Sequence, residues 1–134
     1  MLLICTIAST VNAAIYTINA GSYYYTPSSL TINQGDTVKW INDGGNHDVN
    51  ADINSQTGSS FNNPVSFQSN TTNIVGAIIY THIFTVPGTY SYDCSVGQHA
   101  VNGMTGMIVV NSSNSVYDIV SNSVDHTILK TALD

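Results

Sequence analysis

The sequence is poor in charged residues, and two of the four charged residue types are missing. It contains neither Arg nor Glu, and its formal charge of −6 comes from eight Asp set against Lys39 and Lys130. Proteins that bind nucleic acid neutralise phosphates with clustered Lys and Arg, and two lysines cannot do this. The composition therefore argues against nucleic acid as a partner and favours a protein partner with a basic docking surface.

The sequence also lacks an apolar run that is long enough to span a membrane. A short apolar stretch, Leu2–Ala8, is followed by the small-residue pattern Val11-Asn12-Ala13. A short apolar core before such a site is typical of an export signal that is removed from the mature protein. We therefore expect residues 1–14 to be a signal peptide and the protein to be exported, to the periplasm, the cell surface or the medium.

Cysteine is scarce as well. Of the two Cys residues, Cys5 lies within the expected signal peptide, which leaves Cys94 as the single thiol of the mature chain. One Cys excludes an internal disulfide, and a free thiol is a liability in an oxidising compartment. Ligation of a metal would explain the presence of Cys94, and a buried inert Cys is the alternative.

Cys94 begins a short loop that also carries an imidazole and a thioether. His99 lies five residues after Cys94, and Met104 lies five residues after His99. The alternating run Thr89–Asp93 precedes the loop and the apolar, β-branched run Met107–Val110 follows it, and both are typical of β-strands. A second His would complete a set of two imidazoles, one thiolate and a weak axial Met, which is the ligand set of a mononuclear electron-transfer copper site.

A second imidazole is available in a suitable place. Thr37–Asn42 is predicted to be a strand that ends in the turn-rich stretch Asp43–Asn46, and His47 follows directly. Met107 competes with Met104 for the axial position, but its place in the apolar run predicts that it is a core residue. The expected copper ligands are therefore His47, Cys94, His99 and Met104.

These stretches resemble the cupredoxins, the blue type 1 copper proteins. The resemblance covers about residues 15–111 and includes all four ligand positions in the family's order. The spacing of the loop ligands is most similar to the phytocyanin and auracyanin branches, although phytocyanins usually carry a disulfide. The matching residues are Gly35–Trp40, His47–Val49, Pro87–Cys94 and His99–Met107.

The resemblance implies an all-β fold, a Greek-key β-sandwich, that binds one copper ion and shuttles single electrons between redox partners. It implies a monomer without enzymatic activity. Asp48 and Ser95 occupy positions that commonly hydrogen-bond and tie the two ligand loops together, and a carboxylate at position 48 would lower the reduction potential. The small or apolar loop residues around His99 would form a flat electron-transfer surface, and these are Gly97, Ala100 and Val101.

The remainder of residues 15–111 is consistent with a sandwich of short strands. Strands are expected at Ala14–Asn19, within Tyr23–Ile32, and over Ile74–Thr85 as one long strand or a pair. Trp40 is expected in the core, and His82 is expected to be a half-exposed strand residue. Residues 51–73 are polar and rich in turn formers, so we expect an irregular flap there.

Residues 112–134 differ in character from the rest. Their apolar residues recur at helical spacings, and Val116–Val120 with Asp125–Leu133 is similar to the opening of a fasciclin domain. We expect a linker followed by a short helical segment that is the truncated start of such a domain, with His126 on a helix surface. The alternative is a C-terminal helix that packs on the sandwich.

Two other functions are compatible with the copper ligands. Type 1 sites also occur in multicopper oxidases and copper nitrite reductases, and His99–Gly106 resembles the latter. Those enzymes need further His ligands for a second centre, and only His82 and His126 remain. The other alternative is a copper-binding surface or adhesion module of a larger envelope protein that contains a fasciclin domain.

Overall fold

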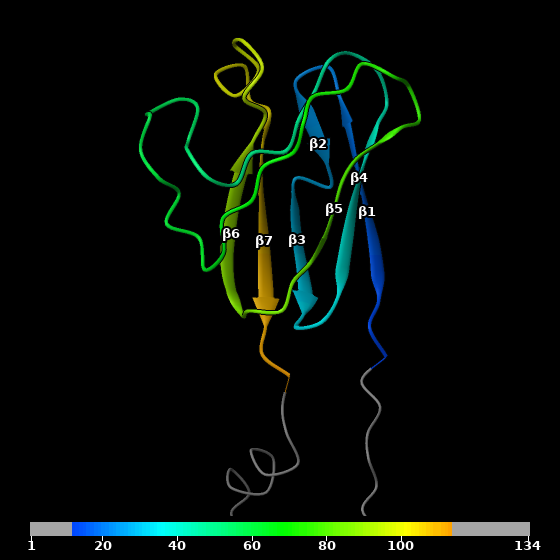
Figure 1. The fold of residues 1–134 in the computed structure, drawn as a ribbon, viewed down its shortest axis with the longest axis vertical. Helices are drawn as coiled ribbons and strands as arrows, with labels where there is room; N and C mark the ends of the chain where they lie inside the picture. The colour runs from blue at the N-terminus through cyan, green and yellow to red at the C-terminus, as the bar shows by residue number, and fades with distance from the viewer. Residues whose placement is uncertain (1–11, 114–134) are drawn as a thin grey trace, which may run out of the picture.

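The computed structural model describes residues 12–113, which form a two-layer β-sandwich (Figure 1). One sheet has the strand order β2-β1-β4-β5 and the other has the order β3-β7-β6. The predicted all-β Greek-key sandwich is confirmed. The strands are β1 (Ile15–Gly21), β2 (Tyr24–Thr26), β3 (Ser29–Asn33), β4 (Thr37–Asn42), β5 (Ile78–Ile83), β6 (Gly88–Asp93) and β7 (Thr105–Asn111).

Three of the predictions concern segments that the structure covers only in part or leaves out. Residues 1–11 of the expected signal peptide lie outside the described residues, and so do the helical segment and the fasciclin resemblance at residues 114–134. Within the described part, no helix is long and apolar enough to cross a membrane.

The strands form where apolar and polar residues alternate, because successive side chains of a strand face opposite sides of the sheet. In β4, Val38, Trp40 and Asn42 are buried, and the residues between them are half-buried. In β6, the two tyrosines of the alternating run, Tyr90 and Tyr92, are both buried. The prediction that Trp40 belongs to the core is therefore confirmed.

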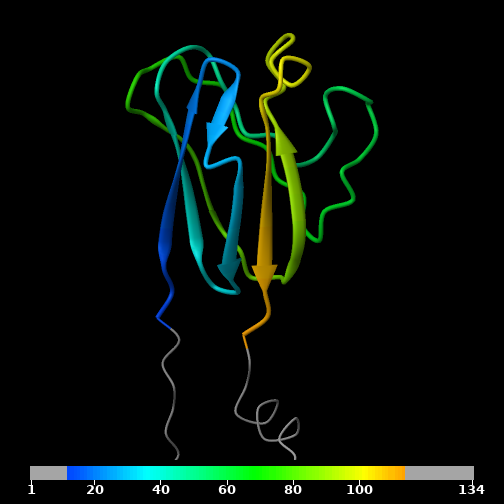
Figure 2. The same cartoon turned by 180° about the vertical axis from the view of Figure 1, so that it is seen from behind.

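Parallel strand pairing within each sheet brings distant parts of the chain together. β1 pairs with β4 in parallel, and β3 pairs with β7 in parallel, whereas β1–β2, β4–β5 and β6–β7 are antiparallel. The loops after β4 and β6 consequently meet at one end of the sandwich, which is the end opposite to Ile15 and Asn111 (Figure 2). This end carries the residues of the expected copper site.

The strand prediction for Ile74–Thr85 is too long. The structure has one strand, Ile78–Ile83, preceded by a turn in which Gly76 adopts a φ of +80°. The N–H of Gly76 donates to the carbonyl of Asn42, so the turn is attached to the end of β4. Strand pairing therefore starts only at Ile78.

The prediction that Met107 is a core residue is also wrong, because its side chain is 39% exposed. The apolar run of β7 follows the two-residue period of a strand, so Ile108 and Val110 face the core and are buried. Met107 lies on the other face. A continuous apolar run alone did not reveal this alternation.

Aromatic side chains fill the interior between the sheets. The Tyr92 ring contacts Trp40 edge-on at a centroid distance of 5.5 Å and Tyr25 at 4.9 Å. Such pairs add about 0.5–1.5 kcal/mol beyond the area that they bury. The Tyr92 ring also covers Gly106 of β7, where a Cβ would overlap its ring atoms. Gly106 is therefore required by the packing and not by its backbone conformation.

The irregular flap predicted for residues 51–73 is confirmed, and it stands beside β6 (Figure 1). Asn63 binds the edge of β6 twice: its Nδ2 donates to the Ser91 carbonyl at 2.7 Å, and its Oδ1 accepts from the Ser91 N–H at 2.8 Å. Ser55 donates to the buried carboxylate of Asp93 through its N–H at 2.7 Å and its hydroxyl at 2.9 Å. The flap thus satisfies the open edge of a strand that leads directly to Cys94.

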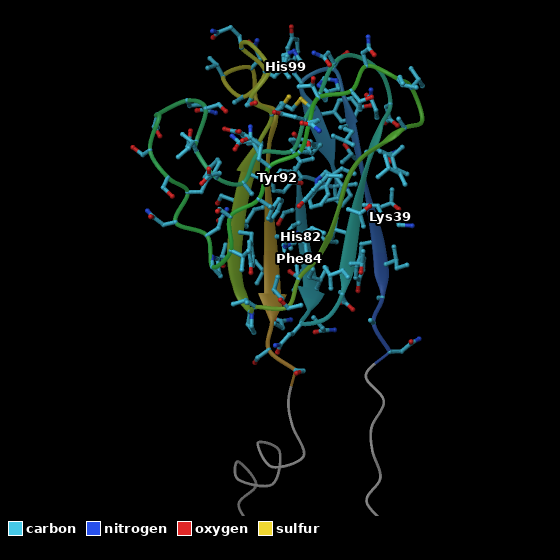
Figure 3. The ribbon with its side chains drawn as sticks, in the orientation of Figure 1. Lys39, His82, Phe84, Tyr92 and His99 are labelled. Atoms are coloured by element: carbon cyan, nitrogen blue, oxygen red, sulfur yellow. The ribbon has the colours of Figure 1, made fainter. Side chains whose placement is uncertain are left out.

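The prediction that His82 is a half-exposed strand residue is confirmed. Its ring is half-buried and stacks on Phe67 at a centroid distance of 4.2 Å, and Phe84 contacts it edge-on at 4.7 Å. Burial lowers the pKa of His82, so the neutral ring is favoured. Figure 3 shows His82 and Phe84 together in the half of the sandwich away from His99.

Candidate metal centre

Three potential metal ligands converge at one end of the sandwich. The donor atoms of His47, Cys94 and His99 all lie within 4.8 Å of one another. The Sγ of Cys94 is 3.4 Å from Nδ1 of His99 and 3.9 Å from Nδ1 of His47, and the two Nδ1 atoms are 3.2 Å apart. Figure 3 shows His99 among the loops at this end, with sulfur atoms close by. The structure therefore brings together three of the four predicted ligands by their donor atoms.

The loop geometry adds Met104 to the same cluster. The N–H of Cys94 donates to the Met104 carbonyl at 3.1 Å, and the N–H of Met104 donates to the His99 carbonyl at 3.0 Å. The Met104 side chain is fully buried. The loop thus closes on itself, and its three ligand residues are tied to one another by backbone hydrogen bonds.

The His47 ring is fixed by the turn that precedes it. Its Nε2 lies 2.8 Å from the carbonyl oxygen of Gly44, and donation by the Nε2–H leaves Nδ1 as the lone-pair atom that faces Cys94 and His99. Gly45 has a φ of +95°, and a Cβ there would approach the His47 ring to 2.7 Å. Burial lowers the pKa of His47, and the hydrogen bond to Gly44 opposes this in part.

The Asn42 side chain holds this turn in shape. Its Nδ2 donates to the Gly45 carbonyl at 3.0 Å, and its Oδ1 accepts from the Gly44 N–H at 3.0 Å. Asn42 is the last residue of β4 and is fully buried. The sequence Asn42-Asp43-Gly44-Gly45 therefore determines the position of His47 as well as ending the strand.

Cys94 is fully buried, and burial raises the pKa of its thiol to about 11. The thiol sulfur and the two imidazole nitrogens face one another within hydrogen-bond distance. Once the thiol is deprotonated, all three can direct a lone pair at one cation, so the donor set fits a metal. Thiolate and thioether sulfur with imidazole nitrogen is the combination that favours copper.

Asp48 and Ser95 connect the two ligand loops, as the resemblance implied. The Ser95 N–H donates to Oδ1 of Asp48 at 2.7 Å, and the Ser95 hydroxyl donates to Oδ2. The Tyr25 hydroxyl donates to the Asp48 carbonyl. Asp48 is buried, so its carboxylate is shielded from water while it accepts these bonds. The loops of His47 and Cys94 are thereby held at a fixed separation.

The predicted surface around His99 needs one correction. Gly97 is exposed and Val101 is 62% exposed, but Ala100 is only 2% exposed. The loop turns tightly here, because the Asn102 N–H donates to the Gln98 carbonyl and the Gly103 N–H donates to the Ala100 carbonyl. Val101 therefore lies at the tip of the loop, and Ala100 is tucked beneath it.

Sequence reasoning missed one residue at this site. The ring of Tyr23, from the turn between β1 and β2, contacts the His99 ring edge-on, with a centroid distance of 5.2 Å and an angle of 87°. Tyr23 is one of three consecutive tyrosines, and nothing in that run distinguishes it from its neighbours. The turn belongs to one sheet and the copper loop joins β6 and β7 of the other, so the two meet only when the sheets pack together.

A β-sandwich that joins two imidazoles, a buried thiol and a Met in this way has the architecture of the type 1 copper proteins. Residues 12–111 match the family of copper binding proteins described as plastocyanin/azurin. The chain belongs to this plastocyanin/azurin family, and copper is the metal of its site.

Individual relatives support the same assignment. A plastocyanin of Synechococcus sp. (strain JA-2-3B'a(2-13)) is 34% identical over 104 residues, which cover 74% of this chain and 75% of that protein. The structure of a purple cupredoxin from Nitrosopumilus maritimus is 27% identical, with a TM-score of 0.54, over 75% of this chain and all of the other. A copper-containing nitrite reductase from Thermus scotoductus SA-01 is 25% identical, with a TM-score of 0.57, over 73% of this chain but only 22% of its own length.

Proposed function

We propose that this protein is an exported carrier of single electrons, with one type 1 copper ion held by His47, Cys94, His99 and Met104. The observation that supports this most directly is the cluster of the Cys94 sulfur and the two Nδ1 atoms within 4.8 Å. Copper at this site supplies the change of one electron between Cu(I) and Cu(II). The protein's own contribution is to hold the donors in one arrangement for both states.

Hydrogen bonds in and between the two loops hold the proposed ligands in place. His47 and His99 would hold the copper ion through their imidazole nitrogens, Cys94 through its thiolate and Met104 through its thioether. The Asp48–Ser95 bonds prevent the loops of His47 and Cys94 from separating, and the backbone bonds within the loop prevent Met104 from moving independently. Outer partners of this kind orient ligands and tune the metal.

The electron would leave and enter at the exposed side of His99. Val101 and Gly97 belong to the same loop as His99 and present apolar, exposed surface, whereas His47 is buried. A redox partner that docks here needs a complementary apolar patch and no charged residue opposite Val101. In this arrangement, the docking surface consists of Gly97 and Val101 without Ala100.

The charge argument for a basic partner is weaker in the structure than in the sequence. Three of the five Asp residues between positions 15 and 111 are buried, where they accept hydrogen bonds. Asp43 and Asp52 remain at the surface, with Lys39 as the cation of the same region. We therefore expect direct ion pairs between these carboxylates and a partner to contribute little to docking. The buried acids are Asp36, Asp48 and Asp93.

A function as one domain of a copper enzyme is less well supported. Such enzymes need a second group of ligands, and among residues 12–113 the group formed by His47, Cys94 and His99 is the one set of three or more His, Cys, Asp or Glu donors close enough to hold a metal. His82 is stacked in the aromatic core instead. A role as a surface module of a larger envelope protein remains the alternative, with the same copper site.

The test begins with copper binding. The purified protein with one equivalent of Cu(II) should show an intense visible absorption from thiolate-to-copper charge transfer, and Cys94→Ser should lose it because a hydroxyl is a poor ligand for copper. A colourless wild-type protein that binds Zn²⁺ but no copper would contradict the proposal.

The electron route is tested by two matched substitutions on exposed aliphatic residues. Val101→Asp is expected to slow reduction by a soluble cytochrome in stopped-flow measurements, while the visible absorption stays. Ile83→Asp alters a side chain of similar exposure, 57% against 62%, and is expected to leave the rate unchanged. Ile83 pairs with Thr37 at the start of β4, which is the end of that strand away from His47. Equal rates for both variants would place the electron route elsewhere.

A further inference from the structure

Tyr23 has a backbone conformation that bulky side chains avoid. It is the second residue of the two-residue turn between β1 and β2, and its φ is +63°. Gly or Asn is usual where the second turn residue has a positive φ, because a Cβ is crowded there. Among the described residues, the only other non-glycine with a positive φ is an asparagine, Asn62. A tyrosine in this position indicates that its side chain makes a contact with a functional role.

The contact that Tyr23 makes is with a copper ligand. Its ring meets the His99 ring edge-on at 5.2 Å and 87°, and the Tyr23 side chain is otherwise 49% exposed. His99 and His47 differ in how their rings are held. The Nε2 of His47 is bound to the Gly44 carbonyl, whereas no hydrogen bond from the described residues reaches Nε2 of His99.

We propose that Tyr23 is a positioning residue of the copper site, whose ring holds the His99 imidazole in its ligating orientation. The Tyr23 ring thus restrains the His99 imidazole, as the hydrogen bond to the Gly44 carbonyl restrains the His47 imidazole. This inference rests on the proposed copper function, because it concerns one of the ligands. Loss of the Tyr23 ring should allow His99 to turn, which weakens copper binding and makes the copper environment heterogeneous.

The variants are chosen so that the backbone conformation is preserved. Tyr23→Asn removes the ring but keeps a residue that tolerates a positive φ, and Tyr23→Phe keeps the ring. The control is Tyr24→Ala. Tyr24 is also exposed, but its ring covers Gly21 and its hydroxyl donates to Asp43 at 3.0 Å, and it does not contact His99. Tyr24→Ala should therefore lower stability and reach the site only through Asp43 in the turn before His47, so we expect it to change the copper spectrum less than Tyr23→Asn does.

Two measurements test the proposal on the copper-loaded protein, and two test it without copper. For Tyr23→Asn we expect Cu(I) affinity, measured by competition with a chromophoric chelator, to fall about threefold to tenfold, which is the equivalent of one aromatic pair. We also expect broader Cu(II) lines in electron paramagnetic resonance. In the metal-free wild-type protein, NMR should show cross-relaxation between the ring protons of Tyr23 and His99. The unfolding midpoint of metal-free Tyr23→Asn should match that of the wild type.

The outcomes separate this inference from the proposed function. Tyr23→Phe should match the wild type in affinity and spectrum, which supports a role of the ring alone. If the wild type binds copper but Tyr23→Asn gives unchanged affinity and unchanged lines, the inference is overturned and the copper function stands. If Tyr24→Ala changes the spectrum as much as Tyr23→Asn does, the effect is a general loosening of the turn and the inference is overturned. A wild type that binds no copper overturns both.

Discussion

Metal binding must displace a proton from Cys94, and the structure determines how many protons are released. Burial raises the pKa of the Cys94 thiol to about 11. At pH 8 the thiolate is therefore only about one part in a thousand of the metal-free protein. Imidazoles are neutral between about pH 8 and 10, and burial lowers the pKa of His47 further. We expect one proton to be released per metal ion in this range, with an apparent affinity that rises about tenfold per pH unit.

Calorimetric titration with Zn²⁺ in buffers of different ionisation enthalpy measures this proton count without redox chemistry. The wild type should release one proton at pH 8, and Cys94→Ser should release none. The pH dependence should become steeper only at a pH below the ordinary pKa of an imidazole, because burial lowers the pKa of His47 and a second proton competes with the metal only there. A wild type that releases no proton at pH 8 would show that the thiolate forms without metal, and the argument from burial would be refuted.

Three further predictions concern the ligands and the packing beneath them. Met104→Gln should lower the reduction potential measured by voltammetry, because an oxygen donor favours Cu(II). Met107→Leu should leave the spectrum unchanged, because Met107 faces outward. The reverse pattern would mean that the loop register is wrong. Asp48→Asn should raise the potential by roughly 50–100 mV, because a buried negative charge beside the site is lost, and an unchanged potential would mean that the charge is fully screened. Gly106→Ala should reduce the free energy of unfolding, measured in urea, by about 1–3 kcal/mol, because its Cβ would overlap the Tyr92 ring. Adding Tyr92→Leu should recover part of that loss. Strict additivity of the two changes would contradict the packing argument.

The ligands could be predicted from the sequence because their geometry is mostly local. Cys94, His99 and Met104 lie in one loop whose backbone hydrogen bonds connect them to one another. His47 follows a strand and a turn whose Asn and Gly residues are recognisable in the sequence. The residue types themselves then restrict the metal. Packing of the two sheets completes the site, because His47 follows β4 of one sheet and the loop with the other ligands joins β6 and β7 of the other sheet. This arrangement followed from the family resemblance and not from any local pattern.

The errors over Ala100 and over the surface charge have a common physical cause, which is that burial depends on neighbours far away in the sequence. Ala100 is buried because the loop turns back on itself and Gln56 of the flap donates to its carbonyl at 2.7 Å. Asp36 looks like an exposed turn residue, yet its carboxylate accepts N–H groups from Ala14 and Asn33 and is buried. A composition counts such a carboxylate as if it were exposed, and so it overestimates the number of carboxylates that a partner can contact.

The two His ligands differ in a way that suits their separate tasks. His47 is buried and its second nitrogen is bound to the Gly44 carbonyl, so it can neither turn nor contact a partner. His99 lies at the surface end of the copper loop, where a hydrogen bond from the protein to its outer nitrogen would cover the edge that a partner must approach. An aromatic contact from Tyr23 restrains the ring from the side and leaves that edge free. The strained turn at Tyr23 can therefore be understood as the cost of orienting a ligand that has to remain accessible.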